Sequence, residues 1–181
     1  NSLVKRNEIY KDGENKMLSQ KDYKLYEITT LEELKGVVTL AKKSNATLFA
    51  SDISEGALEI ASENAQLNGA TVQFIHSNLF ESIEGKFNLI VSNPPYIPTE
   101  DIKGLDKEVR DYEPALALDG GLDGLDFYRA IAKNAIDYLE DGGILIMEFG
   151  IGQASDIATL LQDNFTEIEI KKDLSGIERI I

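Results

Sequence analysis

Short apolar runs alternate along this chain with segments that repeat their apolar residues at helical spacing. The apolar runs are predicted strands, at residues 46–51, 71–76, 87–92 and 143–149. The segments with helical spacing are residues 54–67, 125–139 and 153–164. Strands that alternate with helices pair in parallel and are covered on both faces, so we predict an α/β fold with a mostly parallel sheet. Residues 166–172 and 176–181 are expected to add an antiparallel hairpin at the C-terminus.

Two of these segments carry more specific signals. Ser54 is a predicted N-cap for the helix at 54–67, and Asn68-Gly69 is a predicted end. The apolar face of this helix consists of Ala57, Leu58, Ala61 and Ala65. Residues 143–149 (GILIMEF) are almost continuously apolar, which predicts a strand buried on both faces.

The composition narrows the classes of function. The chain has 181 residues, enough for one domain with a sizeable core. It has no cysteine and one histidine, so we expect no disulfide and no thiolate or multi-histidine metal site, which fits a reducing, cytoplasmic compartment. No apolar stretch is long enough to cross a membrane. The net charge of −14 repels long polyanions, so we expect no direct binding of nucleic acid.

Polar residues follow each predicted strand. Asp52 follows the first strand, Asn78 the second, Asn93 the third and residues 148–152 the fourth. Because parallel sheets bind ligands at the carboxyl ends of their strands, these residues are the candidate site. Asp52 is suited to accept hydrogen bonds from ribose hydroxyls, and it is equally suited to a turn at the start of the next helix.

The stretch Ser77-Asn78-Leu79-Phe80 has two interpretations. The amide oxygen of Asn78 can accept a hydrogen bond from the amino group of an adenine, with Leu79 and Phe80 as an apolar wall. Taken alone, the stretch is more simply a loop with two residues anchored in the core.

The third strand is followed by Asn93-Pro94-Pro95-Tyr96. The prolines cannot extend a paired strand and they restrict the backbone at its end. The side-chain amide of Asn93 and the carbonyl of Pro94 then form a rigid pair of acceptors suited to an –NH2 group. Tyr96 offers a flat face against which a planar amide or base can stack. A simple strand-ending turn is the alternative, but this combination at the ligand-binding edge of a sheet favours a functional role.

This motif resembles the signature of S-adenosylmethionine-dependent methyltransferases that modify a planar exocyclic or amide nitrogen. The stretches around it are IVSNPPYIP, residues 108–129 (EVRDYEPALALDGGLDGLDFYR) and the final KDLSGIERII. They resemble the HemK/PrmC family, the protein-(glutamine-N5) methyltransferases of peptide-chain release factors. The resemblance covers about residues 37 to 181. It implies the Rossmann-like class I methyltransferase fold, S-adenosyl-L-methionine as cofactor and a release factor as protein partner.

The resemblance also implies roles for single residues. It assigns the cofactor to Asp52, Ile53, Asn78, Leu79, Asn93 and Gly36. It assigns catalysis to Asn93, Pro94 and Tyr96, and the substrate amide to these three with Pro95 and Glu113. Asn78 departs from the family, which usually has an aspartate beside the adenine, so an acceptor is kept and a charge is lost. The Asp-Gly-Gly turn at 119–121 is expected to shape the substrate side of the site.

One feature of the family is missing. A glycine-rich loop, approximately Asp-x-Gly-x-Gly-x-Gly, is expected after the first strand and shortly before Val37. The chain reads TTLEELKGVVTLAKK instead, with Gly36 as its one glycine and no recognisable strand before it. Either residues near 34–38 are missing from the sequence, or the chain is truly deleted there and binds the cofactor poorly. The first explanation is favoured, since the rest matches a working enzyme and loss of a central strand would be ruinous.

The domain organisation follows from the same resemblance. Residues 1–35 are predicted to be an N-terminal segment related to the helical substrate-recognition domain of the family, and residues 36–181 the catalytic domain. Two alternative functions remain. One is an adenine-N6 or guanine-N2 methyltransferase of DNA or RNA, against which the acidic charge and the absence of basic-aromatic clusters count. The other is a non-catalytic relative that keeps the fold without the cofactor loop.

Overall fold

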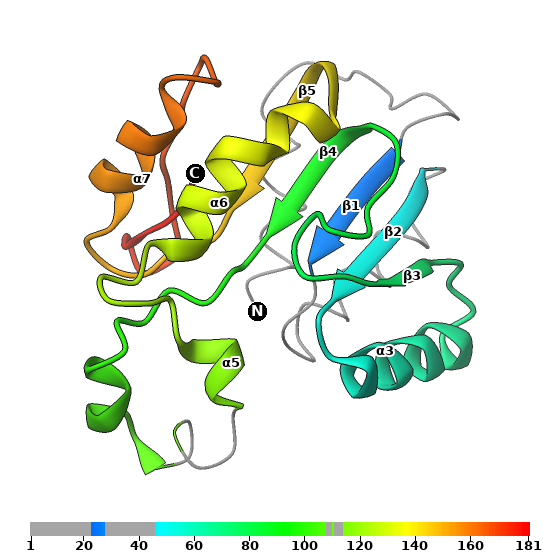
Figure 1. The fold of residues 1–181 in the computed structure, drawn as a ribbon, viewed down its shortest axis with the longest axis horizontal. Helices are drawn as coiled ribbons and strands as arrows, with labels where there is room; N and C mark the ends of the chain where they lie inside the picture. Colours follow the sequence, from blue (N-terminus) through cyan, green and yellow to red (C-terminus); the bar gives the residue numbers. More distant parts are fainter. Residues whose placement is uncertain (1–22, 28–45, 108–109, 111–113) are drawn as a thin grey trace. The chain divides into compact units, whose positions relative to one another are not determined.

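The computed structural model of the chain describes residues 23–27, 46–107, 110 and 114–181 (Figure 1). The chain divides into two compact units. The first unit comprises residues 1–92 and 137–145, and the second comprises residues 93–136 and 146–181.

The first unit is built on a sheet with the strand order β3-β2-β1-β4-β5 (Figure 1). Its strands are β1 (Tyr23–Glu27), β2 (Thr47–Asp52), β3 (Gln73–His76), β4 (Phe87–Ser92) and β5 (Leu139–Met147), whose last two residues lie in the second unit. β1 pairs in parallel with both β2 and β4, and β2 pairs in parallel with β3. The predicted α/β fold with a mostly parallel sheet is confirmed.

β1 corrects one expectation. No strand was recognised before Gly36, yet Tyr23–Glu27 (YKLYE) lies at the centre of the sheet, between β2 and β4. Its two charged residues hid it, because central parallel strands are usually continuous apolar runs. Residues 23–27 of the predicted N-terminal segment are therefore part of the sheet. Gly36 and the expected glycine-rich loop lie outside the described residues.

Helix α3 (Glu55–Leu67) forms as its end signals predict. The N–H of Ala57 donates to Ser54 Oγ at 3.2 Å, which makes Ser54 the N-cap. Gly69, just past the end, has a φ of +63°, the left-handed conformation that commonly ends a helix. The helix packs against β2 and β3 (Figure 1), and its buried face consists of Leu58, Ala61 and Ala65.

The core of the first unit is centred on β4. The ring of Phe87 meets the ring of Phe49 edge to face, with centroids 5.4 Å apart. Fully burying an aliphatic or aromatic side chain contributes about 1.5–3 kcal/mol each. The buried apolar residues of β4 are Phe87, Leu89, Ile90 and Val91. The end of β4, from which the Asn-Pro-Pro-Tyr motif continues, is therefore firmly held.

β5 departs from its prediction. The strand begins at Leu139, and Ile144 is 50% exposed rather than buried on both faces. The reason is that β5 lies at the end of the strand order, so the side chains of this apolar run lack neighbours from a further strand on one side. The helix predicted at 125–139 is correspondingly shorter, since α6 (Asp126–Asn134) is followed by the 3-10 turn η2 (Ala135–Tyr138).

The second unit consists mainly of helices and loops. Its elements are η1 (Asp101–Gly104), α5 (Ala115–Leu118), α6, α7 (Ala154–Leu161), β6 (Lys171–Lys172) and β7 (Glu178–Ile180). α6 contacts α7, and β6 pairs with β7 in the predicted antiparallel hairpin. Ile181 and Met147 exchange two main-chain hydrogen bonds of 2.9 and 2.8 Å, which fix the last residue beside the end of β5. No helix in the described part of the chain is long and apolar enough to span a membrane.

Candidate functional site

Asp52 ends β2 and is only 8% exposed. Its Oδ1 accepts a hydrogen bond of 2.6 Å from the N–H of Ser54. Burial raises the pKa of the Asp52 carboxyl, against the opposing effects of the Ser54 hydrogen bond and of nearby His76. The turn interpretation of Asp52 is confirmed by the Ser54 contact. A carboxylate can accept about four hydrogen bonds, so a ribose contact is compatible with it and stays a prediction.

His76 fixes the residue after Asp52. Its Nε2 lies 2.8 Å from the carbonyl oxygen of Ile53, and its Nδ1 lies 3.6 Å from a carboxylate oxygen of Glu55. The side chain of Ile53 is 45% exposed. The single histidine of the chain therefore links the carboxyl ends of β2 and β3.

The loop after β3 is held by Ser77. Its hydroxyl donates to the carbonyl of Leu79 at 2.9 Å and accepts from the N–H of Ser82 at 2.9 Å. Its own N–H donates to the carbonyl of Asp52 at 3.0 Å. Leu79 has a φ of +48°, a conformation that costs about 1–3 kcal/mol in a non-glycine residue and persists only where its surroundings impose it. Strained backbone thus occurs at one of the predicted cofactor residues.

Asn78 is exposed in this loop, and its Nδ2 donates to Glu81 Oε1 at 2.9 Å. An aspartate at this position would bring two carboxylates to hydrogen-bond distance, which disfavours their ionisation. Asparagine at position 78 therefore avoids this repulsion and donates a hydrogen bond to Glu81. The amide oxygen of Asn78 takes no part in this hydrogen bond and keeps its capacity as an acceptor.

Phe80 is an anchor of the loop. Its ring stacks on Tyr138 with centroids 4.7 Å apart and planes 15° from parallel. The hydroxyl of Tyr138 also donates to the carbonyl of Phe80 at 3.3 Å. No local pattern in the sequence predicts this contact, since the two residues are 58 positions apart.

The Asn-Pro-Pro-Tyr motif opens the second unit, directly after Ser92 of β4. Pro94 and Pro95 are buried, while Asn93 and Tyr96 are partly exposed. The Oδ1 atom of Asn93 is buried and receives no hydrogen bond from the described residues, whereas other atoms of this residue do have partners. The roles predicted for Asn93, Pro94, Pro95 and Tyr96 stay predictions.

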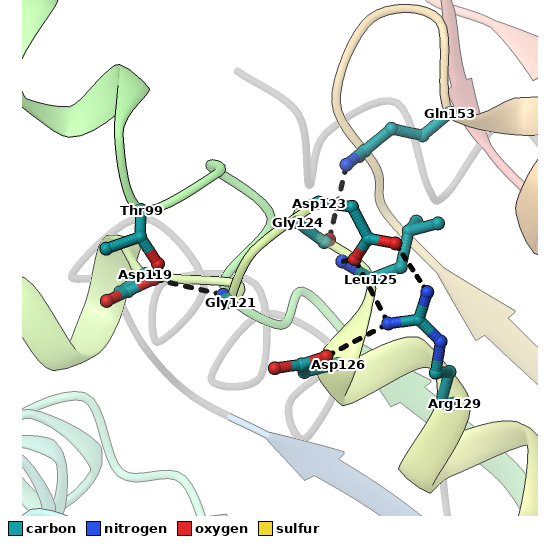
Figure 2. A network of polar contacts seen from close by, with 9 residues as sticks. All are labelled: Thr99, Asp119, Gly121, Asp123, Gly124, Leu125, Asp126, Arg129 and Gln153. Atoms are coloured by element: carbon teal, nitrogen blue, oxygen red, sulfur yellow. Dashed lines mark hydrogen bonds and ion pairs between the residues drawn. The ribbon is translucent and has the colours of Figure 1, made fainter.

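The main chain after the motif pairs with the Asp-Gly-Gly turn. The N–H of Ile97 donates to the carbonyl of Leu118 at 3.1 Å, and the N–H of Gly120 donates back to Ile97 at 2.9 Å. Asp119 reinforces this pairing, because its Oδ1 accepts from Thr99 Oγ1 at 2.7 Å and from Gly121 N at 3.0 Å (Figure 2). These two hydrogen bonds lower the pKa of the Asp119 carboxyl. The turn is therefore attached to the segment that carries Tyr96.

Two glycines allow this close approach. A Cβ on Gly120 would lie 2.9 Å from both the carbonyl oxygen of Pro95 and the Cα of Tyr96. A Cβ on Gly124, where φ is +75°, would lie 2.4 Å from the carbonyl oxygen of Tyr96. Real Cβ atoms do not come so near to backbone, so only glycine fits at these positions.

Gln153 also reaches the motif. Its Nε2 donates to the carbonyl of Tyr96 at 3.0 Å and to that of Gly124 at 3.2 Å, and its Oε1 accepts from the N–H of Gly150 at 2.9 Å. Figure 2 shows the side chain directed at Gly124. The sequence predicts residue 153 only as the start of a helix, and a single glutamine carries no periodic signal that reveals such contacts.

Arg129 closes the same turn from α6. Its guanidinium donates to both carboxylate oxygens of Asp123, at 3.0 and 2.5 Å, and to Asp126 at 2.9 Å (Figure 2). The hydrogen bond to Asp123 raises the pKa of Arg129 and lowers that of Asp123. All three side chains are substantially exposed, so these ion pairs orient the turn more than they stabilise the chain. Among the predicted site residues, Gly36 and Glu113 lie outside the described part of the chain.

Known proteins resemble this chain in sequence. Residues 34–108 match the family model of the methyltransferase small domain. The release factor glutamine methyltransferase of Geobacter sulfurreducens is 46% identical over 147 residues, which is 80% of this chain and 52% of that protein. That of Bacillus cereus is 40% identical over 150 residues, 80% of this chain and 53% of that protein. The predicted resemblance is confirmed, and the chain spans about half the length of the curated relatives it matches.

Solved structures resemble its fold. A methyltransferase from Pyrococcus furiosus has a TM-score of 0.65 at 18% identity, over 99% of this chain and 82% of that chain. Ribosomal protein L11 methylase from Lactobacillus delbrueckii subsp. bulgaricus has a TM-score of 0.61 at 20% identity, over 87% and 67% of the two chains. N-methyltransferase NodS from Bradyrhizobium japonicum, solved with S-adenosyl-L-homocysteine, has a TM-score of 0.55 at 14% identity, over 88% and 75%. The chain therefore has the class I methyltransferase fold.

Proposed function

We propose that this chain, which is homologous to the release factor glutamine methyltransferases, transfers a methyl group from S-adenosyl-L-methionine to a glutamine side-chain amide of a peptide-chain release factor. The observation that carries the proposal is the Asn93-Pro94-Pro95-Tyr96 motif at the end of β4, set in main chain held by the Asp-Gly-Gly turn and by Gln153. Residues 36–181 form the methyltransferase part, to which β1 adds the central strand.

The residues of the first unit fit the adenosyl group of this cofactor. Asp52 offers a carboxylate to the ribose hydroxyls, and Asn78 offers an amide oxygen to the adenine amino group. His76 fixes the carbonyl of Ile53, and Ser77 fixes that of Leu79, so less ordering is needed on binding. When bound, S-adenosyl-L-methionine supplies a methyl group on a positively charged sulfur, already activated for transfer.

The difficult reactant is the amide nitrogen, because its lone pair is delocalised into the carbonyl. The side-chain amide oxygen of Asn93 and the carbonyl oxygen of Pro94 accept hydrogen bonds from the two N–H groups of the substrate amide. These hydrogen bonds favour partial pyramidalisation of its nitrogen. Tyr96 packs against the amide plane. Orientation of this kind supplies many powers of ten in rate without a strong acid or base. The alkylated amide is very acidic, so water takes its proton.

Asn93→Ala tests these roles. We expect kcat for methyl transfer to fall by about 10²-fold or more, as when one polar group that orients a reacting centre is removed. Affinity for S-adenosyl-L-homocysteine, measured by calorimetry, should change little. Asn68→Ala, at the exposed end of α3, is the matched control and should leave both quantities unchanged. Equal loss of turnover and cofactor affinity in Asn93→Ala would refute the assignment.

The methyl acceptor is identified with labelled S-adenosyl-L-methionine. Transfer of label to the glutamine of a release factor supports the proposal. Transfer to DNA or RNA and not to a release factor would identify an adenine-N6 or guanine-N2 methyltransferase instead. A chain that binds no S-adenosyl-L-homocysteine would be the non-catalytic relative.

A further inference from the structure

Gln153 uses its whole side-chain amide within the second unit. A primary amide has two N–H donors and an oxygen acceptor. The nitrogen donates to Tyr96 and Gly124, and the oxygen accepts from Gly150. Three loops that are far apart in the sequence therefore meet at one side chain: the Asn-Pro-Pro-Tyr segment, the glycine-rich turn before α6 and the turn before α7.

The amide does not serve its own helix. Gln153 is the N-cap residue of α7, yet its side chain makes no capping hydrogen bond there. Glutamine is also not among the side chains that N-caps prefer. The position is therefore explained by what the side chain reaches, not by helix formation.

The main chain of Gly150 and of Gly124 lies close to the Gln153 amide. A Cβ on Gly150 would lie 2.8 Å from Gln153 Oε1 and 2.9 Å from the Tyr96 ring atom Cδ2. A Cβ on Gly124 would lie 2.7 Å from Gln153 Nε2. The main chain of Tyr96 is thus fixed by a hydrogen bond from Gln153, and its ring lies close to the main chain of Gly150.

We propose that Gln153 is a positioning residue for methyl transfer: its amide fixes the main chain of Tyr96, and with it the orientation of the acceptors in Asn93-Pro94-Pro95-Tyr96. The inference rests on the proposed function. A misplacement of about 1 Å at a reacting centre can cost on the order of 10²-fold in rate, so loosening this segment affects turnover without any contact to the substrate.

Gln153→Glu is the most informative variant. It keeps the acceptor for Gly150 but places a carboxylate against the carbonyls of Tyr96 and Gly124. We expect kcat/KM for the release factor to fall by about 10²-fold, with affinity for S-adenosyl-L-homocysteine changed by less than about threefold, since that site uses other residues. Protonation of the glutamate restores one donor. The activity relative to the unsubstituted chain should therefore rise as pH falls through the pKa of that carboxyl.

Two further variants control for simple loss of structure. Gln162→Glu makes the same charge change at an exposed position after α7 and should show neither the loss nor the pH trend. Gln153→Met keeps the length and removes all three hydrogen bonds. Amide hydrogen exchange at Gly150 should then accelerate in Gln153→Met but not in Gln153→Glu, which retains the acceptor. Exchange at Ile97 should accelerate in both variants.

The outcomes separate this inference from the proposed function. If the unsubstituted chain methylates no release factor, the proposed function fails, and hydrogen exchange alone decides whether Gln153 fixes the segment. Unchanged exchange at Ile97 in both variants overturns the inference. So does a Gln153→Glu chain that keeps full kcat/KM across the pH range.

Discussion

Gly124→Ala should destabilise the chain more than Gly176→Ala, although both glycines have similar left-handed backbone angles. Gly124 has a φ of +75° and Gly176, in the turn between β6 and β7, has a φ of +80°. A left-handed conformation costs alanine about 1–2 kcal/mol at either position. Gly→Ala also reduces the entropy of the unfolded chain equally in the two variants. The backbone cost and the entropy effect therefore cancel when the two variants are compared. The remaining difference in stability comes from the close approach of other atoms at Gly124.

The difference can be estimated from the contacts. Apart from Gly176 and its chain neighbours, no atom of the described residues lies within 4 Å of a Cβ placed on Gly176, whereas a Cβ on Gly124 would lie 2.4 Å from the carbonyl oxygen of Tyr96. Overpacking of this kind costs about 1–3 kcal/mol. Displacing the Gln153 amide, 2.7 Å from that Cβ, loses a hydrogen bond worth about 0.5–1.5 kcal/mol. Gly124→Ala should therefore lose about 1.5–4.5 kcal/mol more than Gly176→Ala.

Urea unfolding of the two variants and the unsubstituted chain measures this difference. The midpoints give the change in free energy of unfolding as long as the slope m is the same for all three. Equal losses in the two variants would show that the turn at Gly124 can move away from Tyr96 at no cost. The close packing that we infer around the motif would then be wrong.

Two further substitutions test other contacts. Tyr128→Phe removes the hydroxyl that donates to the carbonyl of Glu148 at 2.7 Å, and should lower the free energy of unfolding in urea by about 0.5–1.5 kcal/mol; an unchanged midpoint would contradict this. Asp52→Asn keeps an acceptor for Ser54 but removes a buried charge, so affinity for S-adenosyl-L-homocysteine should fall by about 10- to 100-fold in calorimetry. Because the pKa of Asp52 is raised in the folded chain, its stabilising contribution is lost as pH rises through that pKa, and the unsubstituted chain should lose stability relative to Asp52→Asn over that range. The opposite trend would contradict the burial of this carboxylate.

The elements that the sequence predicts well are those with local signals. α3 has an N-cap serine, a regular apolar face and a terminal glycine, and the structure places its ends where these residues indicate. β4 is a mostly apolar run (FNLIVS) closed by Asn93 and two prolines, and its predicted and observed bounds are the same. In both cases the residues that form the element also mark its ends.

β1 and β5 could not be predicted in this way, because neighbouring strands decide their state. Tyr23–Glu27 is polar enough to suggest a loop, and only pairing with β2 and β4 makes it a strand. Ile144 belongs to an apolar run that suggests complete burial, and only the strand order shows that β5 lies at the end. Strand propensity measures how a residue fits its neighbours in the sheet, so it fails where those neighbours are unknown.

The residues of the candidate site also fall into those that local sequence predicts and those that depend on distant contacts. Asp52, Asn78 and Asn93 can be proposed from the sequence because they follow strands, and parallel strands bring their carboxyl ends to one edge. The sequence does not reveal Gln153, Thr99 and Tyr138, because each acts through a contact to a group that is distant in sequence. Such residues look like ordinary surface positions until the fold brings their partners to them.

Site residues that the sequence predicts differ from those that it does not predict in how the main chain around them is stabilised. At the ends of β2 and β3, the sheet already pairs most backbone groups, and His76 and Ser77 need to satisfy only the few that remain. After β4 the chain has no regular structure until η1, and buried peptide groups there still require partners. Gln153 and the main chain of residues 118–121 supply them from outside the segment. Asp119 holds that supporting turn through Thr99 Oγ1 and Gly121 N, and glycines let it come near. We therefore expect the residues that govern the acceptor side of the site to be amides, small acids and glycines that never touch the substrate.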